Sequence, residues 1–244
     1  MSKLVVCIGL FLASSLLASN TLIHLDGKEV SVYFNDGDTF QMFHGAGQKT
    51  SARLKGYNAL EAYGPVHQWG TWKAEELYQN AEEATREARA GHWTCTTEGT
   101  KDKYGRLLAN CPDLAKHLIS KGLAHAMFVG ADDYNQELVD VQQQAIHSKV
   151  GMWAKGVPDY ILTSVHSSAE KELNGKAYDR FVSVHDGRSS VVNHSNAYSS
   201  CEKIAYSPNE HETASSMIYV PFEKRYGLAK AVCLQHAKDL VEQE

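Results

Sequence analysis

A chain of 244 residues with 43% hydrophobic and 22% charged residues has the composition of a globular protein, with room for one large domain or two small ones. It carries 24 Lys and Arg against 29 Asp and Glu, which gives a formal net charge of −5. This balance argues against broad nucleic-acid binding through a basic domain. Any chemistry on phosphate groups must therefore depend on a local cluster of cations.

The N-terminus has the pattern of a targeting segment. A lysine at position 3 precedes an apolar or small-residue run over 4–17, and Ala18-Ser19 offers a cleavage site. The run is too short to span a bilayer comfortably. We predict a signal peptide over residues 1–19 and a secreted or periplasmic protein with no membrane segment after cleavage. A lipoprotein is less favoured, because bulky residues precede Cys7.

Removal of the signal leaves an even number of cysteines, and in an exported chain an even number favours disulfides: Cys95, Cys111, Cys201 and Cys233. Three pairings are possible. The first two flank a hairpin-like segment and the last two lie in the C-terminal third, so we expect local pairing. A loop of this first size contributes about 3 kcal/mol in the chain-entropy model. The sequence contains no CxxC motif, so we do not expect these cysteines to bind a metal.

The segment 30–61 predicts a β-hairpin followed by a third strand. Apolar residues alternate on both sides of Asn35-Asp36-Gly37-Asp38, and a strand over about 50–57 ends in Asn58-Ala59-Leu60-Glu61. Two carboxylates thus flank the glycine of a turn, near a second group of oxygen-bearing residues. Such oxygens suit Ca²⁺, and the guanidinium of Arg53 suits phosphate. The alternative is an ordinary turn with solvated acids.

Further along the chain, helices and strands alternate. Three- and four-residue spacing predicts a helix over 71–90, and shorter patterns predict strands at 93–96 and 107–111 around a polar loop. Two more helices are expected over 112–120 and 134–149, with Trp153 as a core residue. The order predicts an α+β fold, a five-stranded OB-type barrel with three helices. The remaining residues predict a small β-rich extension.

Several motifs in this order resemble those of the staphylococcal nuclease (thermonuclease) family. They are DGDT at 36–39, RLxGxNxxE at 53–61, DKYGR at 102–106, GLA at 122–124 and GMW at 151–153. The resemblance covers about residues 24–154. We therefore expect a nuclease-like domain over 20–154 and an extension of unknown role over 155–244.

The resemblance implies a role for particular residues. The catalytic set would be Arg53, Glu61 and Arg106, in which the Glu activates water and the guanidiniums hold the scissile phosphate. Ca²⁺ would be held by Asp38, Asn58 and the carbonyl of Ala59. Lys103, Tyr104 and Phe128 would contact the bound nucleotide. The chain departs from the family at Asn58, usually Asp, at Ala59-Leu60, usually Thr-Pro, and in the nearly absent loop between Glu61 and Tyr63.

The resemblance implies a secreted, Ca²⁺-dependent endonuclease that hydrolyses DNA and RNA with little sequence specificity, as a monomer. Apart from the resemblance, these residues supply the parts that phosphodiester hydrolysis needs: an activated water, a charge clamp and a cation. The alternative is a catalytically weak domain that binds nucleic acid or protein, as the loss of a charge at Asn58 would produce. His185-Asp186 in the extension fits a hairpin turn better than a catalytic pair.

Overall fold

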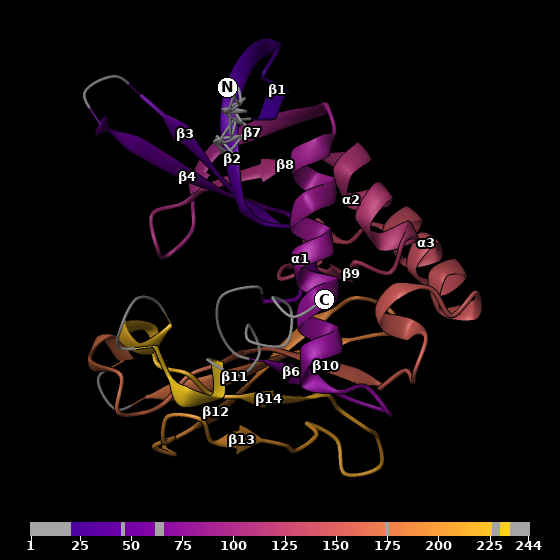
Figure 1. Cartoon of the computed structure of the whole chain (residues 1–244), viewed down its shortest axis with the longest axis vertical. Coiled ribbons are helices and arrows are strands. Elements are labelled where there is room, and N and C mark those ends of the chain that lie inside the picture. Colours follow the sequence, from indigo (N-terminus) through magenta and orange to yellow (C-terminus); the bar gives the residue numbers. More distant parts are fainter. Residues whose placement is uncertain (1–20, 45–46, 62–65, 174–175, 226–229, 235–244) are drawn as a thin grey trace, which may run out of the picture.

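The computed structural model describes residues 21–44, 47–61, 66–173, 176–225 and 230–234 (Figure 1). The predicted signal peptide, which includes Cys7, lies outside these residues. So do Ala62 and Tyr63, in the short loop that follows Glu61. The barrel and its helices form one end of the molecule, and the sheets of the C-terminal part form the other end.

A closed barrel forms the first part of the chain. Its strands, in spatial order, are β1 (Thr21–Leu25), β2 (Lys28–Asp36), β3 (Thr39–Phe43), β4 (Lys49–Leu54), β8 (Leu107–Asn110) and β7 (Trp93–Lys101). The barrel is closed by two parallel pairs, β1 with β7 and β4 with β8. It contains one strand more than the predicted five, because β1 adds to the sheet ahead of the predicted hairpin.

The hairpin of β2 and β3 confirms the alternation seen in the sequence. Val32 pairs with Met42 and Phe34 with Phe40, and all four side chains are buried. The two phenylalanine rings meet edge to face, with centroids 5.5 Å apart. The DGD turn lies against Ala59 and the first helix: a Cβ added at Gly37 would lie 2.8 Å from the Cβ of Ala59 and 3.0 Å from the Cβ of Ala84. Only glycine allows this approach, which brings the two aspartates of the turn close to residue 59.

The predicted single strand over 50–57 is instead two strands. Gly56 has φ +87°, a conformation that few other residues adopt, and it separates β4 from β5 (Gly56–Ala59). After this bend β5 leaves the barrel and pairs with β9 (Ala124–Met127). The sequence predicted no strand at β9, because its four residues lack an alternating pattern.

Three α-helices cover the barrel, as predicted; the second has the predicted bounds, the first begins three residues later, and the third is two residues shorter at each end. They are α1 (Ala74–Ala90), α2 (Pro112–Ser120) and α3 (Gln136–His147). The first begins three residues later than predicted, where Glu76 accepts a hydrogen bond from the backbone N–H of Lys73. The third helix is capped at its start by Asn135, whose side-chain oxygen accepts a hydrogen bond from the N–H of Leu138.

The GLA and GMW motifs contact each other through their glycines. Gly122 and Gly151 both have positive φ, and a Cβ on Gly122 would lie 2.3 Å from the carbonyl oxygen of Val150. The N–H of Met152 donates to the carbonyl of Gly122 at 2.9 Å. This backbone contact fixes the end of α3 against the end of α2 and buries Trp153.

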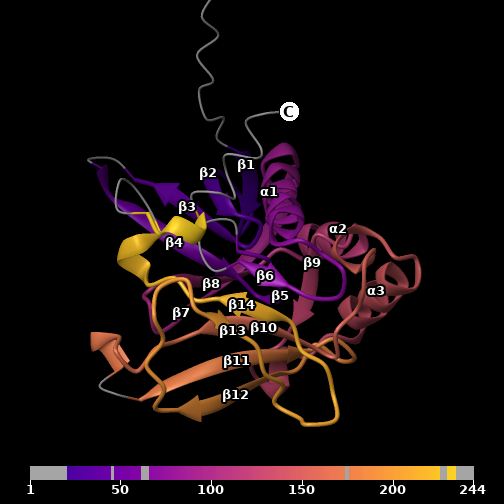
Figure 2. The same cartoon turned by 60° about the horizontal axis from the view of Figure 1, so that its bottom comes forward.

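The C-terminal part of the chain is rich in β structure, as predicted. One sheet contains β10 (Tyr160–Val165), β11 (Ala177–Ser183) and β12 (Ser189–His194), and the 184–188 segment forms the predicted hairpin turn. A second sheet joins β13 (Lys203–Ile204) and β14 (Ser216–Ile218) to β6 (His67–Gln68). This last strand comes from the segment between β5 and α1, so the two parts of the chain share a sheet (Figure 2).

The two parts also share a hydrophobic core. One buried cluster combines Leu77, Trp153 and other residues of the first part with Ile161 and Val184 of the extension. The buried side chain of Gln142 accepts from the N–H of Ala126 at 2.7 Å and donates to the carbonyl of Val184 at 2.6 Å. The extension is therefore packed onto the helical face of the first part.

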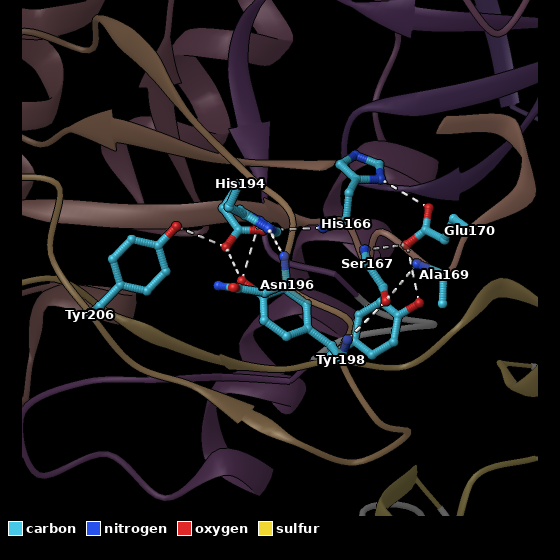
Figure 3. A network of polar contacts seen from close by, with 10 residues as sticks. His166, Ser167, Ala169, Glu170, His194, Asn196, Tyr198 and Tyr206 are labelled. Carbon is cyan, nitrogen blue, oxygen red and sulfur yellow. Dashed lines mark hydrogen bonds and ion pairs between the residues drawn. The ribbon is translucent and has the colours of Figure 1, made fainter. Parts of the chain in front are cut away.

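Figure 3 shows the polar core of the extension, in which His194, Tyr198 and Tyr206 are labelled. It is centred on the carboxylate of Asp179, whose exposed fraction is 0%. The hydroxyls of Tyr198 and Tyr206 donate to this carboxylate at 2.9 and 2.8 Å, and the backbone N–H of His166 donates at 3.2 Å. The ring of His194 lies 3.2 Å from it. Each oxygen thus has partners, which removes most of the cost of burying the charge.

Two disulfides join Cys95 to Cys111 and Cys201 to Cys233, the local pairing predicted from the sequence. The first lies in the barrel, and the second fixes the end of the extension. Among the described residues, no helix is long and apolar enough to cross a membrane.

Candidate active site

The site is built around Asp38, which ends the DGD turn and is 3% exposed. Its Oδ1 pairs with Nη1 of Arg53 and accepts from the hydroxyl of Thr39 at 3.1 Å. Its Oδ2 accepts from the N–H of Ala59 at 2.8 Å. Because Thr39 pairs with Arg53 across β3 and β4, the barrel register itself brings the aspartate and the guanidinium together.

Asn58 and Ala59 complete the set of oxygen atoms beside this carboxylate. Nη2 of Arg53 donates to Oδ1 of Asn58 at 2.6 Å, and Nδ2 of Asn58 donates to the carbonyl of Ala59 at 2.8 Å. The structure thus brings the predicted ligands Asp38, Asn58 and Ala59 into one chain of hydrogen bonds with Arg53. Carboxylate, amide and carbonyl oxygens are the donors that Ca²⁺ prefers.

Asn58 has a second neighbour that the sequence did not reveal. His125, directly opposite on β9, places Nε2 3.3 Å from Nδ2 of Asn58, and its Nδ1 lies 3.1 Å from the carbonyl of Ala126. Burial lowers the pKa of His125 to about 4, so the ring is neutral at physiological pH. A neutral ring whose Nδ1 carries the proton accepts a hydrogen bond from an amide, which an aspartate at position 58 could not donate.

Glu61 follows this strand and is half-buried. Burial and the charge of Asp36 raise its pKa, while the charges of Arg225, Arg53 and Arg106 act to lower it. The three predicted catalytic residues are therefore close enough for their charges to interact. A carboxylate whose pKa is raised is a stronger base once it is ionised, which suits a group that must deprotonate water.

Burial also raises the pKa of Asp36, whose Oδ1 accepts from the N–H of Asp38 at 3.1 Å. It lowers the pKa of Arg53 and raises that of Tyr57, whose hydroxyl donates to the carbonyl of Gly37 at 2.8 Å. Acids and guanidinium are thus all held in an environment that disfavours their charged forms.

The DKYGR loop between β7 and β8 presents the remaining cations. Asp102 fixes Arg106, with Oδ2 2.7 Å from Nε, and its Oδ1 accepts from the N–H groups of Tyr104 and Arg106. Tyr104 is 61% exposed, and the Lys103 Nζ lies 4.9 Å from the centroid of its ring. Lys103 also donates to the hydroxyl of Tyr178 in the extension.

Phe128 does not lie with this exposed group. Its ring is 2% exposed and packs edge to face on Tyr134, with centroids 5.3 Å apart. Its backbone bonds to Gly187 and Ser189 of the extension, and a Cβ on Gly187 would lie 2.7 Å from the ring. In this arrangement the hairpin of the extension covers the position predicted to contact a base.

Three neighbours of the site were missed in the sequence: His125, Arg225 and Tyr178. No motif marks them: His125 directly follows the GLA motif without belonging to it, and Arg225 and Tyr178 come from the extension and reach the site through tertiary packing. Asp36 was noted in the turn, but its influence on Glu61 depends on the bend at Gly56.

The extension contains a second group that could hold a metal ion. One ligand atom each from Asp159, His185 and Glu212 lies within 4.8 Å of the others. The aspartate already accepts from the N–H and hydroxyl of Thr213, both at 2.8 Å. The histidine, half of the pair that the sequence assigned to a hairpin turn, lies 3.1 Å from the same aspartate.

Comparison with known proteins bears on the first of these sites. Residues 52–155 match the model of the family described as staphylococcal nuclease homologue. The matched range contains Arg53, Asn58, Glu61 and Arg106, and it begins after Asp38. No curated protein matches the chain.

Proposed function

We propose that this chain, which contains a staphylococcal nuclease homologue domain in residues 52–155, is an exported Ca²⁺-dependent endonuclease that cleaves DNA and RNA. The proposal is supported by one observation: Glu61, Arg53 and Arg106 lie close enough for their charges to interact, and Arg53 pairs with Asp38. Export is supported by two disulfides, which persist in oxidising compartments.

The protein residues divide the work of hydrolysis. Glu61 accepts a proton from the attacking water, and Arg106 and Arg53 bind the phosphate oxygens on which negative charge develops. Two hydrogen bonds to Asp38 and Asn58 fix the plane of the Arg53 guanidinium. Because a guanidinium has five donors, N–H groups of Arg53 remain for phosphate.

The oxygen set around Asp38 fits a Ca²⁺ ion in kind. The carboxylate of Asp38, the amide oxygen of Asn58 and the carbonyl of Ala59 would hold it, with water at the other positions. When bound, the ion supplies positive charge that polarises the phosphate. With an amide in place of a second carboxylate, we expect weak binding, about 10⁻⁴–10⁻³ M, as in other extracellular Ca²⁺ sites.

One observation favours the alternative, a binding module without catalysis. Arg53 already bonds to both Asp38 and Asn58, so a guanidinium neutralises the acid that a metal ion would need. A domain of this kind would still bind a phosphate backbone, and its binding would not depend on Ca²⁺.

The test is hydrolysis of fluorescent single-stranded DNA and RNA by the purified protein, with Ca²⁺ or with a chelator. We expect activity that chelation abolishes. Glu61→Gln and Arg106→Ala should each lower kcat by at least about a hundredfold, the scale for loss of one transition-state stabiliser. Arg86→Ala is the control, because this Arg is exposed on α1 and pairs with Glu83. Near-full activity of Glu61→Gln would overturn the mechanism, and chelator-resistant binding without hydrolysis would favour the module.

A further inference from the structure

The extension contacts the DKYGR loop through an aromatic residue, Tyr178 of β11. Nζ of Lys103 donates to its hydroxyl and lies 4.5 Å from the centroid of its ring. The same ammonium lies 4.9 Å from the ring of Tyr104. Lys103 is thus held between one ring from the barrel loop and one from the extension, an arrangement that favours a fixed cation.

The tyrosine from the extension is itself firmly placed. The ring of His166 lies against it, with centroids 4.5 Å apart. Its neighbour Asp179 lies on the opposite face of the strand, in the polar core of the extension. Strand β11 pairs on both sides, with β10 and β12. The position of the ring is therefore set by the whole sheet.

Cations and aromatic rings alternate over this contact. Arg106 lies 5.4 Å from the ring of Tyr104, and Arg180, two residues along β11, lies 6.0 Å from the ring of Tyr178. Burial acts to lower the pKa of Lys103, but hydrogen bonds with the two tyrosines raise it more. The ammonium is therefore charged at neutral pH. Such a pattern suits the backbone of a single-stranded nucleic acid.

We propose that strand β11 of the extension forms part of the nucleic-acid-binding surface, in which Tyr178 positions Lys103 for contact with a phosphate of a bound single strand. The proposal rests on the nucleic-acid function of the barrel but not on hydrolysis. Tyr178 acts through Lys103, because its hydroxyl accepts from Lys103 and its ring is contacted by both Lys103 and His166. The extension is thereby assigned a role in substrate binding.

The test measures binding of a fluorescent single-stranded DNA decamer by anisotropy, at several salt concentrations, with Ca²⁺ present. The background is Glu61→Gln, so that binding is read without hydrolysis. In this background Lys103→Met should raise Kd about tenfold and lower the slope of log K against log salt by about 0.7, the value for one phosphate contact on a single strand. Tyr178→Ala should raise Kd about fivefold and lower the slope in the same direction.

A double-mutant cycle separates positioning from direct contact. In the Lys103→Met background, Tyr178→Ala should have no further effect. Tyr33→Ala is the matched control, because the ring of Tyr33 on β2 also lies against a cation: the guanidinium of Arg89, from α1, is 4.5 Å from its centroid. If Tyr178→Ala fails to fold, Tyr178→Phe takes its place. It should raise Kd twofold to fourfold, and this effect too should disappear in the Lys103→Met background.

The proposal would be overturned if Tyr178→Ala weakened DNA binding equally with Lys103 present and in the Lys103→Met background, or if it did not weaken binding at all. Absence of DNA binding by the Glu61→Gln protein would overturn it too. Binding that shows the expected coupling in a protein that proves unable to hydrolyse DNA would support this inference while refuting the nuclease. The two proposals therefore fail separately.

Discussion

Two buried carboxylates, Asp38 in the barrel and Asp179 in the extension, are 3% and 0% exposed, yet their partners differ in kind. Asp38 pairs with the guanidinium of Arg53 and accepts hydrogen bonds from the hydroxyl of Thr39 and the N–H of Ala59. Asp179 accepts hydrogen bonds from two tyrosine hydroxyls and a backbone N–H, beside a histidine.

The difference indicates what each cluster is for. Around Asp38 several charged groups share one buried space, and the pKa values of Asp36 and Glu61 are raised by burial. Around Asp179 the partners are mostly neutral donors, and burial together with the hydrogen bond to Asp179 raises the pKa of Tyr198 to about 12. The first cluster tolerates unfavourable charge and suits a ligand, whereas the second is satisfied and suits stability.

The largest effect should come from the satisfied cluster. Asp179→Ala leaves two tyrosine hydroxyls and a histidine without their acceptor, so we expect a loss of about 3–5 kcal/mol in the free energy of unfolding, as for a broken buried pair. Urea denaturation measures it. Asp186→Ala, at an exposed turn in the same sheet, should cost less than about 1 kcal/mol. If both variants lost a similar free energy of unfolding, Asp179 would not have the stabilising role inferred for it.

Removing a charge from the other cluster should have the opposite sign. Asp36→Asn keeps an oxygen for the N–H of Asp38 and removes a carboxylate whose folded-state pKa is raised. Such an acid destabilises the folded state once it ionises, so we expect a gain of about 1 kcal/mol at pH 7. Below the unfolded pKa, about 3.9, both forms of the chain are protonated and the gain disappears. Unfolding from pH 3 to 8 tests this, and a gain largest at acidic pH would refute it.

A smaller effect is expected at Asn58, where the chain departs from the pattern of the staphylococcal nuclease family that it resembles. Asn58→Asp should lower the Ca²⁺ concentration for half-maximal activity severalfold, because ligand charge sets affinity. It should also raise the pKa of His125, now about 4, since a carboxylate would replace the donor at 3.3 Å. Calcium titrations at fixed salt and NMR titration of the ring give independent readings. Unchanged Ca²⁺ dependence would mean that residue 58 is not a ligand.

The smallest effect concerns Arg225, which the extension contributes. Its charge acts to lower the pKa of Glu61, so Arg225→Ala should raise that pKa further. Because the base must be ionised, the acidic limb of the kcat/KM profile should move to higher pH, by less than about one unit. Lys224→Ala is the neighbouring control. A shift to lower pH would exclude Glu61 as the base.

Local chemistry made the barrel and most of its candidate site predictable. The hairpin around Gly37, the helices and the disulfide from Cys95 to Cys111 depend on residues near one another in sequence. The predicted ligands and arginines also lie in short motifs. Their assignment required the family pattern, since an aspartate turn alone has an ordinary structural explanation.

What the sequence did not predict depends on distant contacts. The bend at Gly56 is invisible in an alternating pattern, and the acceptor role of Asp179 needs residues up to 27 positions away. Tyr178 reaches Lys103 across 75 positions without any motif. Such pairs follow from how sheets pack, which hydrophobic periodicity does not encode.

The strand β6, which pairs with β14, has a consequence for synthesis. Ser216 bonds to Gln68 across 148 positions, so this strand keeps an open edge until the C-terminal part of the chain has been made. At about 5–20 residues per second, that wait lasts several seconds after the barrel is complete. An open edge can pair with another chain. We therefore expect truncated chains to aggregate through the 66–68 segment even when their barrel has folded.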